Sequence, residues 1–161
     1  MNRRCPAAAL ALLFLSAQPA GAEIYKLSAS RKAPNLYSLD SGKAWAVTKA
    51  CYEHATYDAA TVDWNGRGGS VSFARSGAAC DLDILLVQAV QKVGLYQIAV
   101  AREADNLYRA DQGSMYLRTI YCYDYSEGEE AYFNWNGFGG ELTFKGSGAS
   151  CPVESVLAKV P

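Results

Sequence analysis

The sequence has little of what most enzymes and metalloproteins need. Its 161 residues include a single histidine, His54. A histidine acts in catalysis only with a nucleophile or an orienting carboxylate, and no HExxH, GxSxG or Cys–His arrangement occurs. No two cysteines after residue 22 are close enough for a zinc knuckle. We therefore expect no catalytic residue, no metal ion and no cofactor.

Excess charge and long apolar runs are also missing. Residues 23–93 carry 8 basic and 7 acidic side chains, and residues 94–161 carry 5 and 9. Neither half has the basic face that nucleic-acid binding requires. After residue 22, no apolar run reaches the roughly 20 residues that cross a bilayer. The composition thus argues against nucleic acid as a partner and predicts no transmembrane segment.

The N-terminus has the pattern of a signal peptide. Arg3 and Arg4 precede the apolar run Ala7–Ala17, and Ala20-Gly21-Ala22 has the form of a small-x-small cleavage site. Residues 1–22 are therefore predicted to direct export and to be removed. The compartment would be the periplasm or the cell exterior.

The strongest pattern is an internal repeat. The segment Trp64–Phe73 (WNGRGGSVSF) returns 71 positions later as Trp135–Phe144 (WNGFGGELTF). Without a gap, 23 of 67 aligned pairs are identical, and most of these are glycines, aromatic residues and cysteines. These residue types fix the backbone and the core, so the repeat predicts a tandem duplication with units at 23–93 and 94–161. Whether the two units share one core is left open.

Four cysteines follow the signal segment, and the repeat decides how they pair. An even number of cysteines in an exported chain favours disulfides. Because a duplicated unit should carry its own bridge, we predict Cys51–Cys80 and Cys122–Cys151.

Alternating apolar residues and glycine turns predict an all-β fold. Each unit is expected to be an antiparallel, sandwich- or barrel-like structure of about five strands. Long strands are expected at 44–54 and 115–125, and Asn-Gly in each repeated segment favours a hairpin. Residues 81–92 fit either a helix or a strand, and the helix-poor partner segment 152–157 favours a strand. Trp64 and Trp135 are predicted to belong to the core.

A group of aromatic residues in the second unit is the best candidate for a binding surface. On a strand, Tyr121, Tyr123 and Tyr125 would all point to one face, and Tyr123 is expected in the core because the first unit shares it as Tyr52. Tyr121, Tyr125 and the turn residue Phe138 are then candidate binding residues, because tyrosine gives contact area at low entropic cost. The equivalent positions in the first unit are Ala50, His54 and Arg67, and His54 and Arg67 are also counted as candidate binding residues. Packing of the two units through these rings is the competing interpretation.

The sequence thus predicts an exported, non-enzymatic protein that binds another protein or a carbohydrate through this surface. Two alternatives remain. The segment Asp124–Glu130 holds four carboxylates in seven residues, and a small secreted hydrolase would use such groups. A purely structural component of the cell envelope is the other alternative. Neither the ligand nor the oligomeric state follows from the sequence.

Overall fold

The computed structural model describes residues 23–161, so the predicted signal peptide at 1–22 lies outside the described residues. The chain is all-β, with two short 3-10 turns, as the alternating pattern predicts. The first half has the strands β1 (Glu23–Ala33), β2 (Leu36–Leu39), β3 (Ala44–Lys49), β4 (Asp58–Trp64), β5 (Gly69–Phe73) and β6 (Ala79–Gln88), with η1 at Asp40–Gly42. The second has β7 (Gly94–Ala104), β8 (Leu107–Ala110), β9 (Met115–Thr119), β10 (Glu127–Trp135), β11 (Gly140–Phe144) and β12 (Ser150–Lys159), with η2 at Asp111–Gly113.

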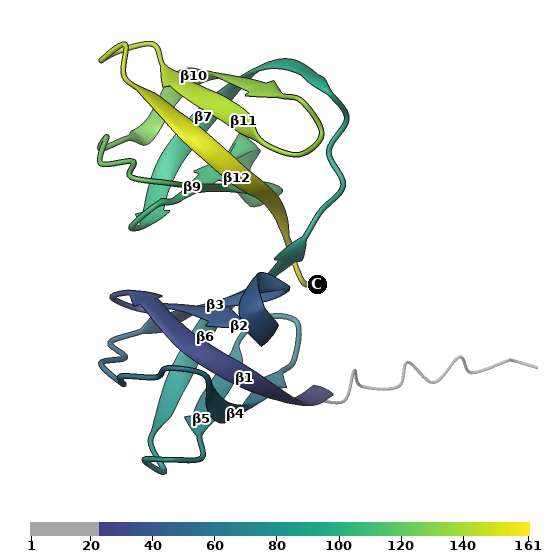
Figure 1. Cartoon of the computed structure of the whole chain (residues 1–161), viewed down its shortest axis with the longest axis vertical. Helices are drawn as coiled ribbons and strands as arrows, with labels where there is room; N and C mark the ends of the chain where they lie inside the picture. The colour runs from purple at the N-terminus through teal and green to yellow at the C-terminus, as the bar shows by residue number, and fades with distance from the viewer. Residues whose placement is uncertain (1–22) are drawn as a thin grey trace, which may run out of the picture.

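Each half is a closed antiparallel barrel of six strands. The strand order is β5-β4-β1-β2-β3-β6 in the first half, and pairing of β6 with β5 closes the ring. The order β11-β10-β7-β8-β9-β12 in the second half is closed in the same way by β12 and β11. Closure leaves no unpaired sheet edge around the barrel. Figure 1 shows the barrels one above the other, with the C-terminus at their junction.

The number of strands per half is six, so the expected five were one too few. The additional strands are the four-residue segments β2 and β8, which are too short for a clear alternating pattern. The ambiguous segment 81–92 belongs largely to strand β6, as predicted. The long strands expected at 44–54 and 115–125 are wrong, because β3 ends at Lys49 and β9 at Thr119. Ala50 and Tyr121 have φ of 46° and 51°, and this left-handed backbone cannot continue a strand.

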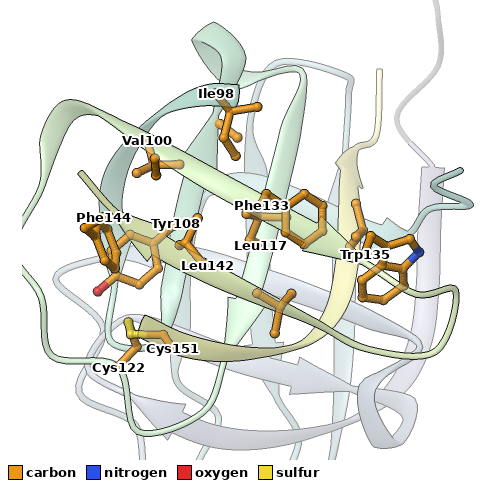
Figure 2. Packing of buried hydrophobic residues seen from close by; sticks show 14 residues of the cluster. Ile98, Val100, Tyr108, Leu117, Cys122, Phe133, Trp135, Leu142, Phe144 and Cys151 are labelled. Atoms are coloured by element: carbon orange, nitrogen blue, oxygen red, sulfur yellow. A yellow bond between two sulfur atoms is a disulfide. The ribbon is translucent and has the colours of Figure 1, made fainter. Parts of the chain in front are cut away.

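Each barrel has its own hydrophobic core. Tyr37 packs on Phe73 in the first half, and Tyr108 packs on Phe144 in the second, with ring centroids 5.2 and 5.3 Å apart. Trp64 and Trp135 are buried in these two cores, as predicted. Both predicted disulfides, Cys51–Cys80 and Cys122–Cys151, are present. Figure 2 shows the second core, with its disulfide at one end of the barrel and Trp135 at the other.

A third hydrophobic cluster joins the two barrels. It contains Leu36, Trp45, Val47, Ile84, Leu86, Leu107, Tyr116 and Leu157. Beside it, strand β6 pairs with strand β12. Leu86 pairs with Lys159, and their equivalents 71 positions away, Leu157 and Gln88, pair with each other. The hydrogen bonds Ala89 N to Val156 O and Val160 N to Leu85 O, 2.9 and 2.8 Å long, are related in the same way. The two halves therefore meet with approximate two-fold symmetry, across an apolar contact.

Candidate binding surface

The loop at 120–126, between β9 and β10, carries the tyrosines that the sequence singled out. Tyr121, Tyr123 and Tyr125 are 81%, 73% and 68% exposed. Cys122, which lies between the first two, and Ser126, which follows the third, are buried. The loop thus alternates between exposed aromatic rings and buried anchors, although it is not a strand.

Covalent and polar contacts hold this loop. Cys122 is bonded to Cys151, and its amide donates to Asn106 Oδ1 at 2.7 Å. The buried Tyr108 hydroxyl donates to the carbonyl oxygen of Asp124 at 2.6 Å. Ser126 Oγ donates to the carbonyl oxygen of Val100 at 2.5 Å. The disulfide and these three hydrogen bonds fix the backbone of the loop, so the tyrosines are presented in one preorganised arrangement.

Three of the four acidic side chains in and beside the loop have separate partners. Glu127 Oε1 accepts from the Tyr125 hydroxyl at 2.8 Å, and this hydrogen bond raises the pKa of Tyr125. Asp124 Oδ2 accepts from Ser147 at 2.6 Å. Lys145 lies 2.5 Å from Glu130 and lowers the pKa of that carboxyl group by hydrogen bonding. Within residues 23–161, no group of three or more His, Cys, Asp and Glu side chains is placed to hold a metal ion.

The remaining candidate residues do not join the tyrosines in one patch. Phe138 is 96% exposed, but it lies in the β10–β11 hairpin, and Tyr125 precedes the other end of β10. Nine residues of strand separate these ends by roughly 25–30 Å. Arg67 is exposed in the equivalent β4–β5 hairpin of the first half. The expected patch of Tyr121, Tyr125 and Phe138 is therefore divided into two places.

His54 and Tyr125 border two hollows that share one residue, Pro34. His54 is exposed in the loop at 50–57 and lines a shallow hollow that includes Pro34. Tyr125 lines another hollow, of about 430 Å³, that also includes Pro34. Arg102 and Asp105, which form an ion pair of 2.6 Å, lie in the same hollow as Tyr125. The two loops thus approach the Pro34 turn from different sides.

Two surface aromatic residues were assigned wrongly from the sequence. Tyr123 and its counterpart Tyr52 were expected in the core, yet they are 73% and 75% exposed. The expectation assumed a continuous strand, in which a shared tyrosine fits a buried position. Because both strands end before these loops, identity between the halves here marks an exposed position.

In each glycine-rich turn, an asparagine side chain occupies two of the backbone amide groups. In the first turn, Asn65 Oδ1 accepts from the amides of Arg67 and Gly68 at 3.0 and 3.1 Å. In the second, Asn136 Oδ1 accepts from Phe138 and Gly139, both at 3.0 Å. This Asx arrangement satisfies the turn from within. The predicted hairpins are confirmed.

We expect alkaline pH to destabilise the fold through its buried tyrosines. Burial raises the pKa of Tyr37, Tyr108 and Tyr116, because the phenolate form is poorly solvated inside the protein. The protonated ring is favoured in the folded state, so the stabilising effect is fully present below the unfolded pKa of about 10 and is lost as pH rises through the higher folded pKa. Urea unfolding between about pH 8 and pH 11 measures this loss.

The variant Tyr108→Phe separates this effect from the titration of lysines, two of which also have raised pKa values. At neutral pH it should lose about 1 kcal/mol with the hydrogen bond to Asp124. Its stability should then fall less steeply than that of the wild type above about pH 10. An identical alkaline slope would contradict the assignment.

The disulfides indicate an oxidising environment for the folded chain. Within residues 23–161, no helix is long and apolar enough to cross a membrane. The chain matches no protein-family model, and it shows no significant similarity to a curated protein or to a solved structure.

Proposed function

We propose that this chain is an exported, non-enzymatic binding protein and that the loop at 120–126 recognises a partner protein. One observation carries the proposal: three tyrosines, each at least 68% exposed, stand on a loop that a disulfide and several hydrogen bonds hold. Exposed aromatic rings have no role in the barrel core. Tyrosine is also the residue type that binding loops favour, because it offers a large amphipathic surface with few rotatable bonds.

The geometry favours a protein over a carbohydrate. Tyr121 and Tyr123 are 81% and 73% exposed, and only Tyr125 borders a hollow, whereas small-ligand sites are concave and enclose most of their ligand. A protruding aromatic loop fits a shallow surface or a pocket on a larger partner. A carbohydrate would have to stack on the outside of the protein, with little of its surface covered.

Charge indicates what the partner surface is like. Residues 94–161 carry 5 basic and 9 acidic side chains. Glu127 and Glu129, both exposed, follow the tyrosines directly. A complementary partner would present basic residues around an apolar contact, and association would slow as salt increases.

Affinity capture followed by titration tests the proposal. The oxidised protein is immobilised and exposed to envelope and extracellular extracts, and a retained protein is identified, purified and titrated. We expect Tyr121→Ala with Tyr125→Ala to weaken binding by roughly 30-fold, as expected for central aromatic contacts. Because both side chains are exposed, the melting temperature should barely change.

The first half supplies the control. Tyr52→Ala with Tyr57→Ala alters two exposed tyrosines of the corresponding loop at 50–57 and should leave the affinity unchanged. Retention of a polysaccharide in place of a protein would move the proposal to carbohydrate recognition. Equal binding by both variants, or no retention at all, would overturn the role of the tyrosine loop.

A further inference from the structure

A second, unrelated site is indicated at the junction of the barrels. A groove of about 480 Å³ lies beside the apolar cluster that joins the two halves. Both halves contribute to its lining, which includes Lys32, Ser38, Trp45, Gln88, Arg118 and Glu154. The volume is in the range of small-molecule sites. It is separate from the hollow that contains Tyr125.

Arg118 is the unusual residue of this groove. Its side chain is only 13% exposed, and its guanidinium group lies 4.9 Å from the centre of the Trp45 ring. Nη1 donates to the carbonyl oxygens of Asn106 and Thr119 at 2.8 and 2.7 Å. Nε has no hydrogen-bond partner, since the carboxylate oxygen of Glu154 is 3.6 Å away. Nη2 forms no hydrogen bond with the described residues, which leaves the charge only partly compensated.

The other half shows that the fold does not need this cation. The residue 71 positions before Arg118 is Val47, and it is 6% exposed in the same apolar cluster. Val47 lies on β3, which pairs with β6. Arg118 lies on β9, which pairs with β12 in the equivalent way. A buried cation costs free energy unless it is fully paired. Burial accordingly lowers the pKa of Arg118. A valine at position 118 would avoid the cost of burying a charge. A bound anion would offset that cost for Arg118.

The remaining lining groups define the ligand more closely. Lys32 is exposed and forms no ion pair among the described residues, so with Arg118 it offers two positive charges to one carboxylate, Glu154. The carboxylate of Glu154 can only accept hydrogen bonds, so it would repel an anionic ligand that has no donor groups of its own. Ser38 and Gln88 add groups that both donate and accept. The groove therefore suits a molecule that has one anionic group and several hydroxyl groups.

We propose that this groove binds a sugar acid, with the carboxylate on Arg118 and Lys32 and the hydroxyl groups on Glu154, Ser38 and Gln88. A carboxylate matches the planar guanidinium group, whose free Nη2 donors would provide the hydrogen bonds that the protein leaves unmade. The proposal does not depend on the tyrosine loop, and either site can exist without the other.

Titration of the oxidised protein with D-glucuronate, D-glucose and sulfate, followed by NMR and calorimetry, tests this. We expect glucuronate to shift the amide signals of residues around Arg118 and Gln88. Glucose, which lacks the carboxylate, and sulfate, which lacks the hydroxyl groups, should bind at least tenfold more weakly. Competing salt should weaken glucuronate binding.

Two variants of the groove are tested, so that a result remains even if the change at the largely buried Arg118 unfolds the protein. Arg118→Met should reduce glucuronate affinity at least tenfold, and Lys32→Met, a change at an exposed residue, should reduce it severalfold without altering the fold. Lys26→Met removes an exposed lysine of the same strand outside the groove and should bind as the wild type does. No shift with glucuronate, equal binding of glucose, tighter binding of sulfate, or binding unaffected by Lys32→Met would each overturn the proposal.

Discussion

Replacing Cys122 and Cys151 by alanine is expected to lower the free energy of unfolding by about 3.5 kcal/mol in the chain-entropy view of disulfides. The bridge closes a loop with a sequence separation of 29 residues. Loss of the bridge frees that loop in the unfolded state, which is then favoured by the regained chain entropy. For a small barrel this is a large share of a total that is typically about 5–15 kcal/mol. Urea unfolding of the variant measures the difference.

The same variant also tests how the tyrosine loop is presented. Without the bridge to Cys151, the loop keeps the hydrogen bonds from Tyr108 and to Asn106 but loses its covalent anchor. Partner binding should then weaken together with stability. Replacing Cys51 and Cys80 in the first half should cost similar stability, because its separation is also 29 residues, and should leave partner binding unchanged. A loss below about 1 kcal/mol, or an equal effect of both variants on binding, would contradict this account.

The repeat explains why the disulfides could be predicted and why the loops could not. Four cysteines allow three pairings, and only the offset of 71 residues selects Cys51–Cys80 and Cys122–Cys151. The offset says nothing of where a strand ends. Residues 115–125 contain enough strand-forming residues for one long strand, yet the chain turns at Tyr121 with φ of 51°. Non-glycine residues rarely adopt this conformation, so local propensity does not predict it.

Asn106 stabilises this turn through hydrogen bonds to residues on both sides of it. It has a positive φ of 57°, which asparagine tolerates, and its side chain accepts from the amide of Cys122 at 2.7 Å. Its carbonyl oxygen accepts from the amide of Thr119 at 2.9 Å. Asn35 makes the same contacts to Cys51 and Thr48 in the first half. Identity of these asparagines was visible in the repeat, but a contact over 16 residues leaves no periodic trace in the sequence.

The groove at the junction was beyond prediction for a different reason. Trp45 and Arg118 approach within 4.9 Å, although 73 positions separate them in the chain. Their contact depends on how the two barrels meet, and nothing local in either strand specifies that arrangement. The sequence does show that Val47 and Arg118, which occupy equivalent positions under the offset of 71 residues, differ between the halves. The structure adds that both side chains are largely buried, and only this burial makes the arginine a candidate for ligand binding.

Gly140→Ala is expected to destabilise the second barrel by about 3 kcal/mol, in the range of overpacked cores. A Cβ atom at this position would lie closer than 3.0 Å to the carbonyl oxygen of Asn134 and at 3.0 Å from the rings of Phe133 and Trp135. Those neighbours are a strand backbone and two buried rings, so neither can move aside cheaply. Gly69 is held in the same way by the backbone of Asp63 in the first half. The third glycine of each repeated hairpin therefore permits close packing of the two strands.

The neighbouring glycine provides a control within the same turn. At Gly139 a Cβ atom would meet only the carbonyl oxygen of Val153, at 3.4 Å, which is close to an ordinary contact. Gly139→Ala should therefore cost less than about 1 kcal/mol, and urea unfolding of the two variants gives the difference directly. Equal losses would mean that backbone freedom in the turn, and not the space at Gly140, explains the repeated glycines. A larger loss in Gly140→Ala shows that strand packing in the barrel requires a glycine there.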